Sequence, residues 1–495
     1  MKPSRHSPLP WPAPALLALA ACAADPPPRS EVELGIELPA RFGLLAPGDA
    51  VRSGGSTPTE ADRGPTPSDP ATAWWQQFGD PDLDALVAAA LDHNRDLQAA
   101  LTRLAAAAAA RTIAGAPLLP AVDASLDAAR QRRLFLGFPF GGGGVPNTTV
   151  TTFGLSLGVR WELDVWGRLR AGDAAALGDQ QAALADYEAA QLSLVGQVCR
   201  GWFAAVEARQ QLALAEATVA TFRATADDVR DRFRRGVRPA LDVHVALTNL
   251  ANAEAEVAAR RDALQRAQRQ LEVLAGRYPA AATATASTLP AALPEVPAVL
   301  PTDLLQRRPD LAAAERRLAA AGCRVEAARA ALYPALTLDG SLGTNGLEPE
   351  DLADVDFRVW SLGAGLFAPL FRGGALRAEV ARQEARAAEA VANYGASLLR
   401  ACAEVEQLLA SERQLVARRE HLDAAARHAT AARDLARERY QAGLADFLAV
   451  ADGQRQAFTA AAARIAVDRA SCDNRIDLLL ALGGGYVPNS TGAAP

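Results

Sequence analysis

The side chains that most often perform chemistry are few in this chain and lie far apart. The five histidines and the four cysteines beyond residue 22 are His6, His93, His244, His421, His428, Cys199, Cys323, Cys402 and Cys472. His421 and His428 share a face of one expected helix, but seven residues of helix separate them by about 10 Å, too far for one metal ion. The cysteines show no metal-ligand spacing and are expected to be small core residues. The sequence therefore predicts no metal site, no cofactor, no pair of nucleophile and base, and no enzyme.

Two further motifs are better explained by structure than by chemistry. The glycines from Gly141 to Gly144 precede an expected strand and are not followed by Lys and Ser or Thr, so they predict a flexible loop rather than a phosphate loop. The segment Arg308-Pro309-Asp310 is expected to begin a helix, because proline fits the first turn.

One cysteine, Cys22, stands in a context that predicts covalent modification. Residues 1–21 combine Lys2, Arg5 and a short apolar run, as in a bacterial signal peptide. The run Leu19-Ala20-Ala21-Cys22 resembles a lipobox, in which the cysteine is lipidated and becomes the mature N-terminus. The alternative is a simple secretory signal with a small buried cysteine. The residue after the cysteine is Ala23 and not Asp, which resembles the lipoproteins that are sorted to the outer membrane.

The composition of residues 22–73 predicts a tether, and the charge of the whole chain does not indicate a nucleic-acid partner. Residues 22–73 are rich in Pro, Gly, Ser and Thr and are expected to form a tether, reaching the start of an equatorial region. The net charge of −6 gives no reason to expect nucleic acid. No apolar segment approaches the roughly 20 residues of a membrane-spanning helix.

Two stretches predict helices far too long for a globular domain. They run from Gly167 to Arg235 and from Gly374 to Ala442, and neither contains proline. Apolar or small residues recur every seven positions in the second, as in a coiled-coil seam: Val380, Ala387, Tyr394, Ala401, Leu408, Leu415 and Leu422. Such a helix is on the order of 100 Å long. Each is expected to turn at a glycine, Gly236 or Gly443, and to double back in an elongated bundle or tube.

Four other stretches change from helical period to period two. They lie at about 121–134, 150–165, 335–345 and 356–371. Phe153, Leu155, Leu157, Val159, Trp161, Leu163 and Val165 point to one face of the second stretch, and Ser156, Arg160, Glu162 and Asp164 point to the other. Charges facing inward are costly in a soluble sheet, but the same pattern is expected in a barrel with lipid outside and water within. We therefore expect Arg160, Glu162 and Asp164 to face a lumen.

The chain contains two copies of one unit. Phe233, Gly236 and Leu241 recur 207 residues later as Tyr440, Gly443 and Leu448, and further upstream the offset is 214 residues. The repeats are expected over 74–276 and 302–483, with a proline-rich linker at 277–301 and a tail at 484–495. The predicted fold class is an α+β membrane protein with an internal two-fold repeat.

Four strands cannot close a barrel, and an open edge in lipid leaves backbone groups unpaired. The chain is therefore expected to assemble with copies of itself. Two copies supply eight strands, whose interior is filled by side chains, whereas three supply twelve and a water-filled lumen.

Several motifs together resemble the TolC/OprM outer-membrane efflux factors, in the NodT-type lipoprotein branch. They are Asp80-Pro81-Asp82-Leu83, the segment from Trp161 to Arg168, the segment from Leu304 to Leu311, and Ala314-Glu315. The resemblance covers essentially residues 19–485. It implies a homotrimer with a twelve-stranded β-barrel above an α-helical coiled-coil tunnel, anchored by lipid in the outer membrane and extending into the periplasm. It also implies a periplasmic adaptor (membrane fusion) protein and an inner-membrane pump, usually of the RND class, as partners.

The leading functional hypothesis is a passive exit duct for small molecules such as drugs or toxic compounds. The alternatives are a structural coiled-coil periplasmic lipoprotein without a pore, and an outer-membrane component for metal-ion or type I protein export. A lipid-anchored periplasmic enzyme is disfavoured, since no site can be nominated.

The resemblance also implies a gate where the long helices turn. Acids at the start of the returning helix of the second copy ring the closed aperture in this family, and Asp452 matches one such position. A second acidic position falls on Ala449 here. The alternative for Asp452 is a favourable place near a helix N-terminus. Asp446, the other gate candidate, is expected to cap that helix.

Overall fold

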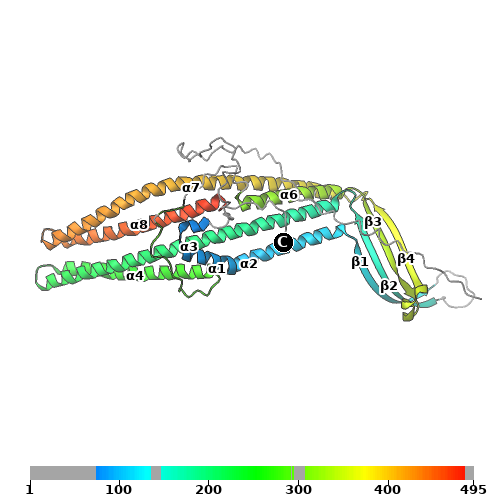
Figure 1. The fold of residues 1–495 in the computed structure, drawn as a ribbon, viewed down its shortest axis with the longest axis horizontal. Helices are drawn as coiled ribbons and strands as arrows, with labels where there is room; N and C mark the ends of the chain where they lie inside the picture. Colours follow the sequence, from blue (N-terminus) through cyan, green and yellow to red (C-terminus); the bar gives the residue numbers. More distant parts are fainter. Residues whose placement is uncertain (1–73, 135–146, 291, 295–306, 485–495) are drawn as a thin grey trace, which may run out of the picture. The chain divides into compact units, whose positions relative to one another are not determined.

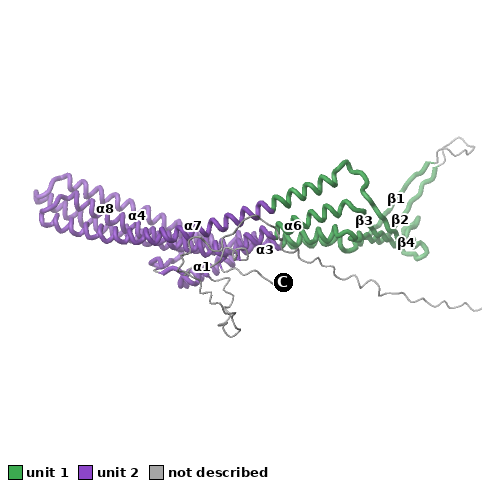
Figure 2. The backbone as a smooth tube through the Cα atoms, turned by 90° about the horizontal axis from the view of Figure 1, so that it is seen from above, with its two compact units in different colours: residues 1–30, 107–180, 316–390 green, residues 31–106, 181–315, 391–495 purple. Residues whose placement is uncertain are grey.

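The computed structural model describes residues 74–134, 147–290, 292–294 and 307–484. The described part of the chain is mainly helical and contains one four-stranded sheet. Cys22, the expected signal peptide and the expected tether lie outside the described residues, as do Gly141 to Gly144 and most of the expected tail. Figure 1 shows the elements, and Figure 2 shows the two compact units into which the chain divides. Each unit takes residues from both halves of the sequence.

The elements follow one another in chain order. They are η2 Trp74–Phe78, α1 Pro81–His93, α2 Arg95–Gly115, η3 Ala116–Leu118, β1 Ala121–Leu134, β2 Asn147–Leu163, α3 Arg168–Arg234, α4 Ala240–Leu274, α6 Pro309–Ala330, β3 Ala335–Gly346, η5 Pro349–Ala353, η6 Val355–Phe357, β4 Arg358–Phe367, α7 Ala375–Gln441 and α8 Phe447–Ala481. Helices α3 and α7 have 67 residues each, and α4 and α8 have 35 each. The two long helices expected from the sequence are confirmed, and the expected seam on α7 is buried or half-buried at every position.

The first unit holds the sheet, in residues 107–180 and 316–390. Its strands are all antiparallel, in the order β1-β2-β3-β4. Below the sheet, α3 and α6 approach closely at Gly178, where an added Cβ would lie 3.0 Å from Cβ of Ala320 and 3.2 Å from the carbonyl oxygen of Arg316. Glycine at this position therefore sets the spacing of the two helices.

Two strand boundaries differ from the sequence prediction. Strand β2 ends at Leu163, because the carboxylate of Asp164 turns to accept backbone N–H groups of the next helix, α3. Strand β4 covers only Arg358–Phe367, because Val355–Phe357 forms a 3₁₀ turn before it and Pro369 follows it. Val165 and Asp164 are thus not strand residues, and Asp164 is corrected from a strand position to a helix cap.

The second unit is a set of helical hairpins with a core along its length. Near α1, the buried side chains come from η2, α1, α2, α3, α4 and α8 and include Leu83, Trp202, Leu271 and Ile476. The start of α1 is fixed by Asp80, whose carboxylate accepts N–H of Asp82 and Leu83 and, through its other oxygen, the indole N–H of Trp202. One side chain therefore caps a helix and ties it to the bundle.

The segment after α4 is also held by a side chain. Glu272 is buried, and its carboxylate accepts backbone N–H groups of Ala281, Ala282 and Thr283 as well as the Thr283 hydroxyl, at 2.6 to 3.2 Å. Burial acts to raise the pKa of Glu272, but these hydrogen bonds outweigh it and lower that pKa. The carboxylate thus remains charged and straps the linker to the helices.

Candidate functional site

The first candidate site is the turn end of the two hairpins, defined as residues 226–246 and 440–455. Gly236 and Gly443 lie in the turns with φ of 74° and 75°, a conformation that glycine adopts without a Cβ clash. The next residues close each helix, since N–H of Val237 bonds the carbonyl of Arg232 and N–H of Leu444 bonds that of Arg439. The structure thus places both glycines where the long helices reverse.

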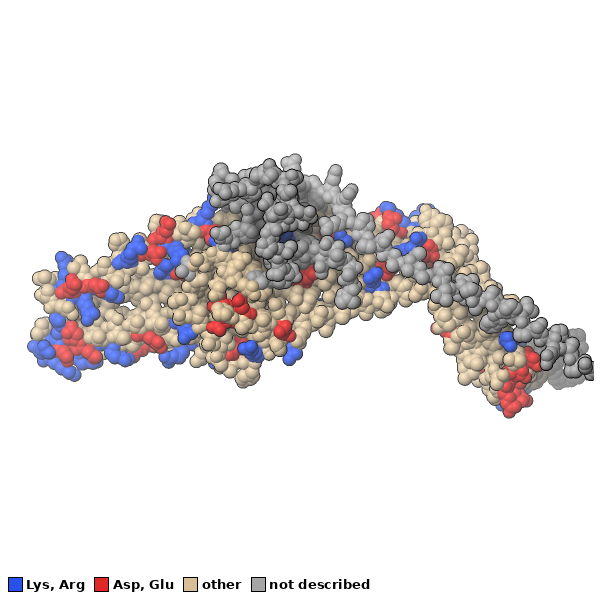
Figure 3. All heavy atoms as spheres, viewed as in Figure 1, with Lys and Arg blue, Asp and Glu red and all other residues tan. Residues whose placement is uncertain are grey.

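A small apolar core joins the hairpins at this end. Its buried members are Ala226, Val229, Ala246, Tyr440, Phe447, Val450 and Ala451. They come from α3, α4, α7 and α8, so all four helices meet here. In Figure 3, basic and acidic side chains gather around this end, which agrees with the many arginine and aspartate residues near the turns.

The ring of Tyr440 is held between two arginines of the other hairpin. The guanidinium carbon of Arg238 lies 4.4 Å from the ring centroid and that of Arg232 lies 5.0 Å from it. Arg238 also donates to the carbonyl oxygen of Ala445 at 3.3 Å, in the turn after α7. Burial raises the pKa of the Tyr440 hydroxyl, against the effect of both arginines, so the phenol stays neutral. Arg238 therefore connects the α3–α4 turn both to the end of α7 and to the turn that follows α7.

The two gate candidates of the sequence lie on α8 but are engaged differently. Asp446 is the N-cap, and its carboxylate accepts N–H of Ala449 at 3.0 Å. Asp452 is about half exposed and bonds Arg455 and Gln456 of its own helix, each at 2.6 Å. Within one chain, the structure does not bring these two carboxylates together on a common ligand.

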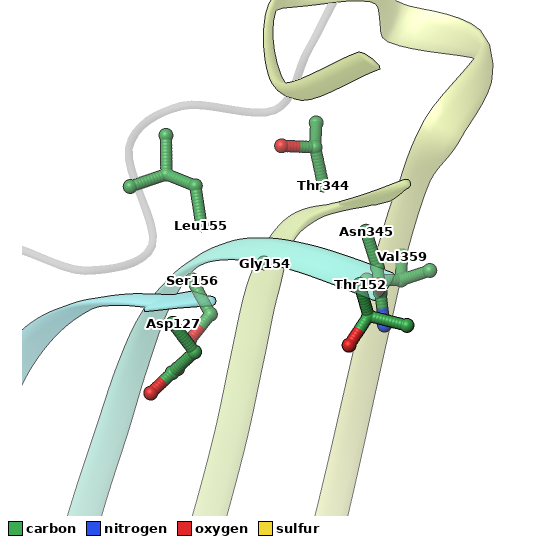
Figure 4. A pocket seen from close by; sticks show the side chains of 8 residues that line it. All are labelled: Asp127, Thr152, Gly154, Leu155, Ser156, Thr344, Asn345 and Val359. Carbon is green, nitrogen blue, oxygen red and sulfur yellow. The ribbon is translucent and has the colours of Figure 1, made fainter. Parts of the chain in front are cut away.

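The second candidate site is the charged face of the sheet. Arg160 and Asp339 are register partners on β2 and β3, and their side chains form an ion pair at 3.0 Å. Glu162, at the base of β2, accepts hydrogen bonds from the guanidinium of Arg168 at 2.8 Å. Serine pairs extend this face, with 2.8 Å between the hydroxyls of Ser125 and Ser156 and of Ser341 and Ser361. A hollow of about 220 Å³ lies at the outer end of this face. In Figure 4, Asp127 and Ser156 point to one side of the sheet, and Leu155 and Thr344 point to the other.

The base of the sheet is closed by Asp164 and two aromatic residues. Burial acts to raise the pKa of Asp164, but hydrogen bonds from Arg170 and Leu169 outweigh it and lower that pKa. The rings of Trp166 and Tyr333 stack with 5.0 Å between centroids, and the Trp166 indole donates to the carbonyl of Pro334. These contacts fix the point at which strand gives way to helix.

The opposite face of the sheet is apolar and open to solvent. Its exposed side chains include Val122, Leu126, Leu155, Leu157, Val159, Leu342, Trp360, Leu362 and Leu366. In water, an apolar surface of this size would be unstable unless lipid or protein covered it. The period-two pattern predicted this face correctly.

Sequence reasoning missed Arg238, Tyr440 and Asp339 as site residues. Asp339 could have been found, because it alternates with Thr337 and Ser341 on β3 in the same way as Arg160 on β2. Arg238 and Tyr440 lie 202 positions apart and carry no local signal. In the described residues, no group of three or more His, Cys, Asp or Glu side chains could hold a metal ion. No helix in that part of the chain combines the length and apolar character needed to cross a membrane.

Strands with one exposed apolar face and one charged face, joined to long helical hairpins, define a duct protein of the outer-membrane type. The family described as outer membrane efflux protein matches residues 86–277 and 300–484. The chain is 34% identical to the pyoverdine export outer membrane protein OpmQ of Pseudomonas aeruginosa over 489 residues, which cover 97% of each chain. It is 32% identical to the toluene efflux pump outer membrane protein TtgC of Pseudomonas putida, over 83% of this chain and 85% of that one.

Two solved structures of outer-membrane proteins are similar to the chain over most of its length. The outer-membrane channel OprN superimposes with a TM-score of 0.77 at 29% identity, over 83% of this chain and 92% of that chain. The outer membrane protein VceC of Vibrio cholerae gives a TM-score of 0.76 at 27% identity, over 84% and 99%. The chain belongs to the outer membrane efflux protein family.

Proposed function

We propose that three copies of this chain form a duct, with a twelve-stranded barrel across the outer membrane continued by a tunnel of helices. The proposal rests on the different character of the two faces of the sheet. One face exposes apolar side chains such as Leu157 and Trp360, and the other carries the Arg160–Asp339 ion pair. Strands β1 and β4 each have a free edge, which lipid cannot satisfy. Closure by further copies pairs these edges, and twelve strands leave room for a lumen.

The duct is passive in this proposal. The chain supplies a sealed path, and a partner pump in the inner membrane, of the RND class, supplies the energy through a periplasmic adaptor protein. Arg160 and Glu162 line the lumen, while the Leu157 face contacts lipid. An aqueous, charged lining would allow polar and amphipathic small molecules to leave without entering the bilayer.

The turn end of the hairpins is the proposed gate. Three copies around one axis would bring three Asp452 carboxylates near each other, where they could attract cations or pair with arginines of neighbouring copies. The Arg238–Tyr440 contact would hold each hairpin pair closed. Asp446 contributes as the helix cap.

Lipid attached to Cys22 is proposed as a second anchor. Mass spectrometry of the mature N-terminus would detect a chain that begins at a diacylated Cys22. A chain cleaved elsewhere, or an unmodified Cys22, would contradict the anchor and leave the duct proposal unaffected.

Pyoverdine is a specific candidate cargo beside drugs and toxic compounds. It is favoured by the similarity to OpmQ, whose name states pyoverdine export, over 97% of both chains. A strain that lacks its own duct for pyoverdine and carries this chain with its pump and adaptor should recover secretion, measured by fluorescence of the medium. Recovery of antibiotic resistance without pyoverdine secretion would favour the drug-like cargo.

The duct itself is tested with the purified full chain. In planar bilayers we expect discrete conductance steps, and native mass spectrometry in detergent should give three copies. A periplasmic spacer without a pore would give no conductance, and a stable monomer or dimer would contradict the twelve-stranded barrel.

A further inference from the structure

The outer end of β1 carries three exposed arginines, Arg130, Arg132 and Arg133, here called the basic end. Arg132 donates to Oδ1 of Asn147 at 3.2 Å. None of the three forms an ion pair with a carboxylate of the described residues, although the chain forms many such pairs elsewhere. Their positive charge is thus left unneutralised within the described part of the chain.

The segment that links β3 to β4, residues 347–357, carries the opposite charge. Its acids, here called the acidic segment, are Glu348, Glu350, Asp351, Asp354 and Asp356. Asp351 and Asp354 accept backbone N–H groups of the segment, which fixes its turns. No described arginine or lysine forms an ion pair with any of the five acids. In Figure 3 they form a patch of acidic side chains at the end of the sheet.

Two arginines of the basic end lie on the same face of the sheet as the acidic segment, whereas Arg133 alternates to the other face. Arg130 and Arg132 share the face of Leu126, whose register partner on β2 is Leu155. Leu155 in turn pairs with Thr344 on β3, and the hydroxyl of Thr344 donates to the carbonyl oxygen of Leu352 in the acidic segment. The acidic segment is therefore folded over the Leu155 side of the sheet, the side to which the Leu155 and Thr344 side chains point in Figure 4.

The described residues of one chain form no ion pair between the two groups. The η5 part of the acidic segment contacts β2 and β3, whereas Asp354 and Asp356 directly precede β4. Strands β2 and β3 lie between β1 and β4, so three strand spacings, about 14 Å in all, separate the two free edges of one chain. Strand β4 is antiparallel to β1, so the residues that precede β4 lie at the same end of the sheet as the end of β1. When β1 of one copy meets β4 of another, Asp354 and Asp356 lie at the same end of the joined edges as Arg130 and Arg132.

We propose that the basic end of each copy docks against the acidic segment of the neighbouring copy and forms an ionic clamp at the outer rim of the assembly. The inference rests on the proposed ring of three copies. It identifies the contact by which the free edge of one copy recognises the free edge of the next. Opposite charges on the two free edges favour β1–β4 pairing, whereas β1–β1 or β4–β4 pairing would bring like charges together. The clamp also fixes the register of the edge strands, which backbone hydrogen bonds alone specify weakly.

Cysteine pairs in the full-length chain test the contact directly. Arg132→Cys combined with Asp354→Cys, or Arg130→Cys with Asp356→Cys, should give disulfide-linked dimers and trimers on non-reducing gels after mild oxidation. The single variants should give neither. The matched control combines Asp123→Cys, at the inner end of β1, with Asp354→Cys, and should not give a linked trimer.

Charge exchange tests whether the contact stabilises the assembly. Arg130→Glu with Arg132→Glu should lower the temperature at which the oligomer dissociates, and Asp354→Arg with Asp356→Arg should do the same. All four substitutions together should restore the wild-type temperature. The wild type should also lose this stability near 1 M salt, where the screening length is about 3 Å.

The outcomes separate this inference from the proposed duct. Wild-type trimers with conductance, but no cross-links in the cysteine pairs and no rescue by charge exchange, would overturn the clamp and leave the duct standing. If the wild type forms no trimers and gives no conductance, the proposed duct is wrong, and the clamp that rests on it is overturned as well. If chelation of divalent cations destabilises the oligomer and the arginine variants do not, the acidic segment contacts cation-bridged lipid, which also overturns the clamp.

Discussion

Arg238 lies over the ring of Tyr440, with 4.4 Å between its guanidinium carbon and the ring centroid, and so joins the turn of one hairpin to the last helical turn of the other. A desolvated contact of this type contributes about 0.5 to 2 kcal/mol. It is formed at the proposed gate. We expect it to hold the turn end closed.

The first prediction follows from this contact. Arg238→Ala should raise the resting conductance of single channels in planar bilayers, because the link to Tyr440 and to the Ala445 carbonyl is lost. Tyr440→Leu, which keeps an apolar side chain and removes the aromatic face, should act in the same direction. Arg235→Ala, in the same turn and exposed, is the control and should leave conductance unchanged. Equal conductance in all three variants would remove the link from the gate.

The second prediction concerns Asp452. Asp452→Ala should change the resting conductance and weaken block by divalent cations, because three carboxylates around the axis would no longer attract them. The oligomer should still assemble, since the carboxylate bonds only Arg455 and Gln456 of its own helix. Asp434→Ala is a matched control, because Asp434 is also exposed, near the same turn, and paired with an arginine. If cation block survives in the Asp452 variant, its role is confined to the helix end.

The third prediction compares two adjacent positions of β2 that point to opposite faces. Leu157→Arg near mid-bilayer should cost about 2 to 4 kcal/mol and impair insertion. Ser156→Arg adds the same charge to the polar face and should insert normally. Insertion is measured as the heat-resistant fraction in outer-membrane preparations. Equal loss in both variants would contradict the assignment of lipid and lumen faces.

The fourth prediction concerns the strap formed by Glu272. Glu272→Gln removes the negative charge and replaces one acceptor oxygen by a donor, so hydrogen bonds worth about 1.5 to 3 kcal/mol each are weakened or lost. Because the folded-state pKa is lowered, the contribution of this group is present above its ordinary pKa and is lost as pH falls through the folded value. Protease cleavage within 278–290 should become faster in the variant. Glu254→Gln, which removes an exposed pair with Arg223, should cleave as the wild type does.

The fifth prediction concerns a charge cluster between α3 and α8. Burial raises the pKa of Asp473 to about 6, Asp477 and Glu207 add to this effect, and Arg469 and Arg200 oppose it. A raised folded-state pKa means that the native state binds the proton more tightly than the unfolded state does. Ionised Asp473 therefore lowers the free energy of unfolding at neutral pH, and this penalty is relieved as pH falls through the folded-state pKa of about 6 and on to the ordinary pKa near 4.

Asp473→Asn isolates this contribution. The full shift would correspond to about 3 kcal/mol, and partial exposure of the carboxylate reduces the expected effect to about 1 kcal/mol. The variant should be more stable than the wild type at pH 7.5, and this difference should fall by about half at pH 5 and further toward pH 4, measured by thermal unfolding of the oligomer at each pH. A difference that does not change with pH would contradict the prediction.

Local patterns predicted most of the secondary structure. The heptad seam and the absence of proline predicted α3 and α7 to within one residue at each end, because such long helices depend on periodicity and on breakers that are visible in the sequence. Alternation predicted the two faces of β2, but it also extended the strand to Val165. Alternation carries no signal for a carboxylate that turns to cap the next helix, as Asp164 does.

The contacts of the candidate sites were less predictable. The Arg160–Asp339 pair depends on the register of two strands 179 residues apart, and the Arg238–Tyr440 contact depends on how two hairpins meet. Each such contact needs the tertiary arrangement before its partner can be named. The position of Asp446 three residues after Gly443 predicted the helix cap that the structure shows, whereas Asp452 was proposed for the gate from the family resemblance and its partners Arg455 and Gln456 were not predicted.

The equal arms of the two hairpins have a consequence for how such a chain can change over evolutionary time. Arg238 meets Tyr440 only because α3 and α7 have the same length and both turn at the same level. A deletion of seven residues in one arm would draw its turn back by about 10 Å and break that contact, while the heptad pattern within the arm stayed intact. Insertions and deletions in the two halves are therefore expected to be inherited as matched pairs, so that the length of the hairpins is a property that neither half can alter alone.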